Sequence, residues 1–140
     1  MTVYVDTSAL LRLVLAEAGA LRLDVLRSCD RLVANELIAI EAARTIDRLR
    51  LQGALSAVEA AERIAMVNDW LEAIDLVLLR APVLGRASEP FATPLDTLDA
   101  VHLATALVWR DRMHDPLQIA THDGALALAA RAYSFTVIGA

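Results

Sequence analysis

The chain has 140 residues, of which 57% are hydrophobic, and it carries a formal net charge of −5. This length fits one domain with a buried core, so the sequence predicts a single domain over residues 1–140. No long uncharged apolar run is present, which excludes a membrane-spanning helix, and the negative charge argues against general attraction to nucleic acid. Its one cysteine, Cys29, excludes an internal disulfide. We expect a cytoplasmic protein that does not bind a membrane.

Short strand-like runs alternate with helix-like segments along the chain. Strands are predicted at residues 2–5, 31–34, 74–79, 117–121 and 134–138. Helices are predicted at residues 7–16, 21–29 (after a break near Gly19), 36–51, 56–70, 97–110 and 124–131, with an irregular stretch or a short helix at 82–94. This alternation predicts an α/β fold with a mostly parallel central sheet and helices on both of its faces.

Polar residues mark where three of these helices begin. Asn35 is the expected N-cap of helix 36–51, and Thr97 is the expected N-cap of helix 97–110. Ser56 with Glu59 three residues later has the spacing of a capping box.

Four acidic residues occupy unusual places in this pattern. Asp6 and Asp123 each directly follow an apolar, strand-like run. In a parallel sheet, ligands bind beyond the carboxyl ends of the strands, near the point where the strand order reverses. Glu41 and Asp99 lie in apolar helical segments, where a buried lone carboxylate is costly without a partner or a cation. The four acids together predict one site, assembled by folding, that holds a hard divalent cation.

Each acid also has a purely structural explanation. Asp6 and Asp123 are both suitable helix N-caps. Glu41 has the spacing to form an ion pair with Arg44 on the same helix face. Asp99 is favourable in a first helical turn because of the helix dipole. These explanations would all have to hold at once to remove the predicted site.

Other proteins that place an Asp after a first strand are excluded by the residues present. Receiver domains and haloacid-dehalogenase-like phosphatases need a Lys near that Asp, and every basic residue here is Arg. The phosphatases also need a second Asp two residues later, where this chain has Ser8. A dinucleotide-binding role is excluded because no Gly-x-Gly-x-x-Gly follows a strand.

Four segments, in this order along the chain, carry a resemblance to a known family. They are residues 3–10 (VYVDTSAL), 35–37 (NEL) followed by Glu41 and Arg44, 98–106 (LDAVHLATA), and 120–123 (ATHD). Together they resemble the PIN domain, specifically the small VapC-type ribonuclease toxins of prokaryotic toxin–antitoxin pairs. The resemblance spans nearly the whole chain and implies a PIN-like three-layer α/β/α sandwich.

The resemblance also implies an activity, an endoribonuclease that depends on Mg²⁺ or Mn²⁺. The implied metal ligands are Asp6, Asp99 and Asp123, while Glu41 would orient the attacking water or act as a base. The residues expected to support these four carboxylates are Ser8, Thr121 and Arg44.

The implied partners are an RNA substrate, a cognate antitoxin protein and a second copy of the chain in a homodimer. Two other roles stay open. One is a PIN nuclease of housekeeping RNA processing or DNA repair, and the other is an inactive PIN binding module.

Three residues beside the motifs need separate interpretation. Asp96 stands where VapC-like sequences often carry Arg or a neutral residue, and it fits either a rim acid or a capping carboxylate. His102, on an apolar helix face, is expected to be a hydrogen-bonded core residue and not a metal ligand. His122 is assigned no role.

Overall fold

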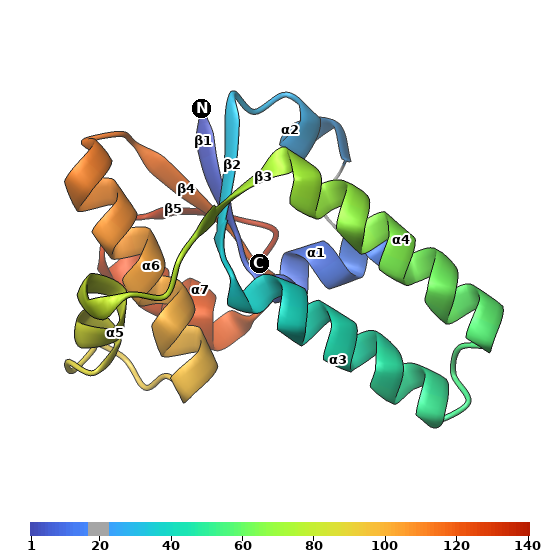
Figure 1. Ribbon diagram of the computed structural model, residues 1–140. Helices are drawn as coiled ribbons and strands as arrows, with labels where there is room; N and C mark the ends of the chain where they lie inside the picture. Colours follow the sequence, from blue (N-terminus) through green and yellow to red (C-terminus); the bar gives the residue numbers. More distant parts are fainter. Residues whose placement is uncertain (17–22) are drawn as a thin grey trace.

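A computed structural model describes residues 1–16 and 23–140, and it confirms the predicted α/β architecture. Five strands form one sheet in the order β3-β2-β1-β4-β5 (Figure 1). Every pairing in this sheet is parallel. The strands are β1 (Thr2–Val5), β2 (Arg31–Asn35), β3 (Ile74–Val77), β4 (Leu117–Ala120) and β5 (Thr136–Ile138).

Helices cover both faces of the sheet, which gives three α/β/α layers (Figure 1). They are α1 (Thr7–Val14), α2 (Leu23–Arg27), α3 (Leu37–Leu51), α4 (Ala57–Ala73), α5 (Ala81–Ala87), α6 (Thr97–Met113) and α7 (Gly124–Ala132). One face packs against α1, α3 and α4, and the other packs against α6 and α7, with α5 resting on α6. None of the described helices combines the length and the apolar composition that crossing a bilayer requires.

The central strand β1 shows why the sheet needs cover on both sides. Its side chains alternate, so Val3 and Val5 enter the core on the α1/α3/α4 side and Tyr4 enters the core on the α6/α7 side. All three are at most 1% exposed. Burial on both faces explains why the strand reads as a continuous apolar run without polar alternation.

Two predicted helix starts differ from the structure, and one is confirmed. The capping box of Ser56 and Glu59 begins α4 as predicted. Asp96, and not Thr97, is the N-cap of α6, because its carboxylate accepts the backbone N–H of Asp99. Asn35 ends β2 and is not the N-cap of α3, where Glu36 takes that position.

Most helix and strand boundaries differ from prediction by a few residues. Helix α4 continues to Ala73, directly before β3, and β3 is correspondingly shorter than predicted. Helix α6 runs on to Met113 and ends at His114, which adopts a left-handed conformation with φ of 50°. The predicted break near Gly19 and the first residues of the predicted helix 21–29 lie outside the described residues.

The sheet has its switch point at the central strand. From β1 the chain moves to β2 and β3 on one side, and then returns to β4 and β5 on the other side. The crevice beyond the carboxyl ends of β1 and β4 is therefore where a parallel sheet of this kind places a ligand. Asp6 follows β1 and Asp123 follows β4, so the fold brings these two acids to the same edge.

The capping box of α4 supplies a local test of the fold. Ser56→Ala removes the hydroxyl that accepts the Glu59 backbone N–H, and we expect the free energy of unfolding to fall by about 1 kcal/mol. Urea denaturation of wild type, Ser56→Ala and Glu62→Ala measures this, because Glu62 is an exposed residue of the same helix. Equal destabilisation by both substitutions would contradict the capping role.

Candidate functional site

Asp6 is buried at the carboxyl end of β1, with only 3% of its surface exposed. Its backbone N–H extends the pairing with β4 by donating to Ala120 O, and its Oδ1 accepts the Ala9 N–H at 3.0 Å as the N-cap of α1. The hydroxyls of Ser8 and Thr121 both donate to its carboxylate at 2.8 Å. Burial raises the pKa of Asp6, while these hydrogen bonds act in the opposite direction. Ser8 and Thr121 thus fix the Asp6 carboxylate in one orientation.

Asp123 stands directly across the switch point, at the start of α7. Its Oδ1 accepts the Leu126 N–H at 2.9 Å, and its own N–H donates to Thr121 Oγ1. Asp6 and Asp123 are therefore both helix N-caps, as the structural alternative required. A cap uses one of the roughly four lone-pair positions of a carboxylate, so capping leaves both side chains able to bind a cation.

Asp99 is the acid whose ionisation the site disturbs most. It lies in the first turn of α6 and is partly exposed, and none of the described residues donates a hydrogen bond to its carboxylate. Burial raises the pKa of Asp99 to about 7, and the negative charges of Asp123, Asp96 and Asp6 add to this effect. The raised pKa reports that the acids are close enough to repel one another.

A cleft of about 250 Å³ joins all four predicted acids. Its walls come from α1, α3, α6 and the start of α7, and its lining residues are Asp6, Thr7, Ser8, Leu11, Glu41, Thr45, Asp96, Leu98, Asp99, His102 and Asp123. A larger groove of about 810 Å³ lies between α5 and the start of α6, but of the four acids it contains none. The smaller cleft is therefore the candidate site.

Glu41 reaches the cleft from α3 and is held from the protein interior. Its Oε1 accepts the Thr7 hydroxyl at 2.9 Å and lies 2.7 Å from His102 Nε2. Arg44, the partner considered from the sequence, is exposed and forms no ion pair with Glu41. The supporting role expected of Arg44 stays a prediction.

His102 has the character predicted for it, a buried and hydrogen-bonded core histidine. Its side chain is 2% exposed, and its Nδ1 lies 2.7 Å from the Tyr4 hydroxyl. The sequence analysis assigned no role to Tyr4, Thr7 or Asn35, which complete this polar cluster. The one available signal was the alternation of β1, which turns Tyr4 towards α6 while Val3 and Val5 face α1 and α3.

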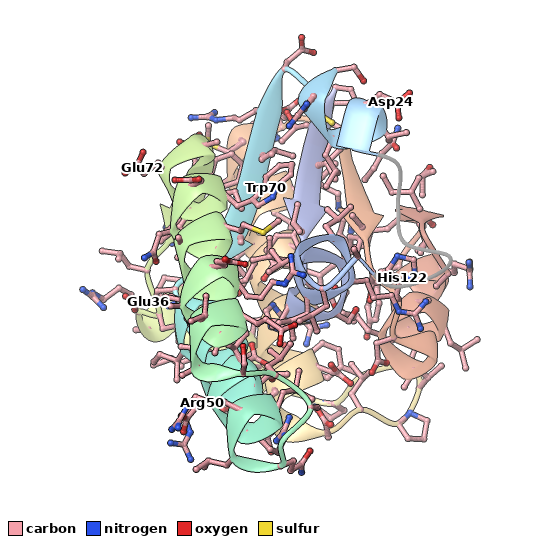
Figure 2. All side chains as sticks on the ribbon, turned by 90° about the vertical axis from the view of Figure 1, so that its right-hand side faces the viewer. Asp24, Glu36, Arg50, Trp70, Glu72 and His122 are labelled. Carbon is pink, nitrogen blue, oxygen red and sulfur yellow. The ribbon has the colours of Figure 1, made fainter. Side chains whose placement is uncertain are left out.

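His122 lies at the rim of the site, at the end of β4. Its backbone N–H donates to Ser8 Oγ at 2.8 Å, and Figure 2 shows it beside α1. In the same view Arg50 and Glu72 point away from the core. The charged outer faces of α3 and α4 are thus separate from the acidic cleft.

The residues of the cleft fit a hard divalent cation. Their donors are carboxylate oxygens, which suit Mg²⁺ or Mn²⁺ better than softer metals. Among residues 1–16 and 23–140, no three His, Cys, Asp or Glu side chains are grouped closely enough to enclose a metal. Mg²⁺ does not require such a cage, because it is usually bound by one or two carboxylates together with waters and substrate phosphate. The mutual repulsion at Asp99 is what a cation would relieve.

The fold and the cleft together define an α/β protein with an acidic site at the switch point of a parallel sheet. The family model of the PIN domain matches residues 3–133, and the chain therefore belongs to the PIN domain family. PIN domains are generally metal-dependent nucleases, so this is a nuclease fold. Among curated proteins, no sequence matches the chain.

The raised pKa of Asp99 predicts a pH-dependent cost to stability. Its value of about 7 lies above the model value of 3.8, so ionised Asp99 destabilises the folded state. The cost is absent below pH 4, grows between pH 4 and 7, and is complete above 7. Asp99→Asn should therefore be more stable than wild type at pH 8, by about 1–2 kcal/mol after allowance for solvent screening, and equally stable near pH 4.

Urea unfolding in the presence of a chelator measures this difference at the two pH values. Glu62→Gln, which removes an exposed charge on α4, is the control and should show no such pH dependence. If Asp99→Asn and wild type are equally stable at pH 8, the acids do not repel one another as described.

Proposed function

We propose that this PIN domain is a Mg²⁺- or Mn²⁺-dependent endoribonuclease and the toxin of a VapBC-like toxin–antitoxin pair. The observation that carries the nuclease activity is the convergence of Asp6, Glu41, Asp99 and Asp123 on one cleft. The pKa of Asp99 shows that this convergence is close enough to be felt as charge repulsion. The choice of RNA and the toxin role rest on the resemblance of the sequence motifs to VapC-type toxins.

The proposed division of labour follows from how each acid is held. Asp6 and Asp99 would be the principal metal ligands, with Asp123 binding directly or through a water. When bound, the cation would lower the pKa of a coordinated water and stabilise negative charge on the phosphate. Glu41 would orient the attacking water or accept its proton. Ser8 and Thr121 keep the Asp6 carboxylate in place by their hydrogen bonds.

Cleavage by water needs no protein nucleophile. The attack would be in line with the leaving 3′ oxygen and would yield a 5′-phosphate and a 3′-hydroxyl, as the family resemblance implies. The four carboxylates are all present, which disfavours an inactive binding module.

The toxin role brings two protein partners with it, an antitoxin and a second copy of the chain. Apolar side chains that remain exposed in the single chain favour such association. They include Ile40 at 60%, Leu78 at 50% and Leu84 at 47% exposed. A neighbouring small reading frame, with a DNA-binding N-terminus and an Arg-bearing C-terminal tail, would separate the toxin from a housekeeping PIN nuclease. Both roles are proposed for the cytoplasm.

Loss of charge at Asp6 should remove the activity. Asp6→Asn keeps the side-chain volume but removes the charge that holds the cation, and we expect RNA cleavage to fall by at least about 100-fold. Growth inhibition on induction in cells should disappear as well. The measurement is cleavage of a labelled RNA pool with Mg²⁺ or Mn²⁺, after circular dichroism has shown that the variant is folded.

Asp96→Asn is the matched control for this substitution. Asn serves as an N-cap about as well as Asp, so α6 should begin normally, and Asp96 is exposed at the rim of the cleft. We expect a much smaller effect. A folded Asp6→Asn protein that still cleaves RNA and still stops growth would show that the metal assignment is wrong.

The homodimer should be visible in solution. Sedimentation of the purified chain at micromolar concentration should give the mass of two copies, because association would cover the exposed apolar side chains of α3, β3 and α5. A stable monomer across that concentration range would count against the dimer and leave the nuclease proposal unaffected.

A further inference from the structure

A cluster of buried polar side chains lies directly beneath Glu41. His102 is at its centre and joins β1 to α3, because Nδ1 lies 2.7 Å from Tyr4 Oη and Nε2 lies 2.7 Å from Glu41 Oε1. Asn35 and Thr105 complete the cluster, and both are fully buried. Polar groups placed this deep need their hydrogen bonds satisfied, so the position of each proton matters.

The orientation of the Asn35 amide is fixed by the backbone. Its Oδ1 accepts the Leu37 N–H at 3.0 Å, so its Nδ2 must face the other way. On that side Nδ2 lies 3.2 Å from Thr105 Oγ1 and 3.4 Å from His102 Nδ1. An amide nitrogen can only donate, and therefore His102 Nδ1 is an acceptor.

The Tyr4 hydroxyl adds a second donor to the same nitrogen. Burial raises the pKa of Tyr4 well above its usual value, and the charge of Asp6 raises it further, so the hydroxyl keeps its proton. With Nδ1 accepting, the proton of the neutral imidazole is on Nε2. Nε2–H then donates to Glu41 Oε1, which as a carboxylate oxygen can only accept.

This arrangement fixes one half of the Glu41 carboxylate and leaves the other half available. Oε1 receives the Thr7 hydroxyl and the His102 N–H, whereas none of the described residues donates to Oε2. The side chain is 20% exposed, towards the cleft. A neutral donor orients Glu41 without the full positive charge that an arginine would bring, so the carboxylate retains more of its basicity.

We propose that His102 is a positioning residue for the nuclease reaction, held in its Nε2–H tautomer by Tyr4 and Asn35 so that Glu41 presents Oε2 to the attacking water. This inference rests on the proposed nuclease function and deepens it. It assigns work to a buried residue that does not touch the substrate, and it makes Glu41 the catalytic partner whose orientation His102 controls.

The tautomer can be tested without any activity. Side-chain ¹H–¹⁵N correlation spectra of ¹⁵N-histidine-labelled protein, free of metal, should show His102 protonated on Nε2 and unprotonated on Nδ1. The His102→Gln spectrum identifies the resonances. Tyr4→Phe removes one donor to Nδ1, so the Nδ1 resonance should move towards that of a nitrogen without hydrogen bonds. Protonation on Nδ1 in the wild-type protein would overturn the inference.

The kinetic test separates positioning from a purely structural role. His102→Leu should lower kcat by about 10- to 100-fold with KM nearly unchanged, because the substrate still binds while Glu41 is no longer oriented. His102→Gln should recover part of the loss, since its amide N–H can still donate to Glu41. Tyr4→Phe, which removes a single oxygen atom, should lower kcat by a few-fold and keeps the test valid if His102→Leu fails to fold.

Thr2→Val is the matched control on the same strand. It also removes a buried hydroxyl from β1, but that hydroxyl binds Asp115 at the opposite end of the sheet, so kcat per folded molecule should not change. If the wild type cleaves RNA and folded Tyr4→Phe and His102→Gln keep the full kcat, the positioning role is overturned alone. If the wild type cleaves no RNA with Mg²⁺ or Mn²⁺, the proposed function fails instead.

Discussion

Repulsion among carboxylates in a partly desolvated cleft is the constraint on which the site depends. Asp99 shows it most clearly, because burial and the charges of Asp123, Asp96 and Asp6 all raise its pKa. The fold offsets part of this cost with dipoles. Asp6, Asp96 and Asp123 are the N-caps of α1, α6 and α7, and the positive ends of three helices therefore meet the negative charge. Such dipoles contribute about 0.3–1 kcal/mol each, which leaves room for a cation.

The site has two polar layers with different chemistry. The outer layer is anionic and reaches solvent through the cleft, where the acids can meet a cation and a phosphate. The inner layer is neutral, because Tyr4, Asn35 and His102 satisfy one another deep in the protein. Glu41 connects the layers, with one oxygen bonded inwards and the other exposed to the cleft. This separation lets a parallel sheet carry concentrated negative charge at its edge without placing unpaired charge in its core.

Much of the fold and the outer layer could be predicted from the sequence because both depend on local patterns. Apolar runs bounded by polar residues locate the strands, and Asp6 and Asp123 follow directly from the strand ends. The inner layer could not be predicted in this way. The meeting of Tyr4 with His102 depends on how α6 packs across the sheet, which only the tertiary structure determines. Glu41 illustrates the same limit, because helical spacing suggested Arg44 while the core-facing side of α3 directs it to His102.

The central claim is that Asp6 and Asp99 hold one divalent cation at the switch point of the sheet. Anomalous X-ray diffraction from crystals of the protein grown with Mn²⁺ tests this most directly, because the metal position is seen without reference to activity. The account predicts an anomalous peak within coordination distance of both the Asp6 and the Asp99 carboxylates. It also predicts that the peak is lost in Asp99→Asn crystals. A cleft without a peak at saturating Mn²⁺, or a peak bound away from both residues, would contradict the account.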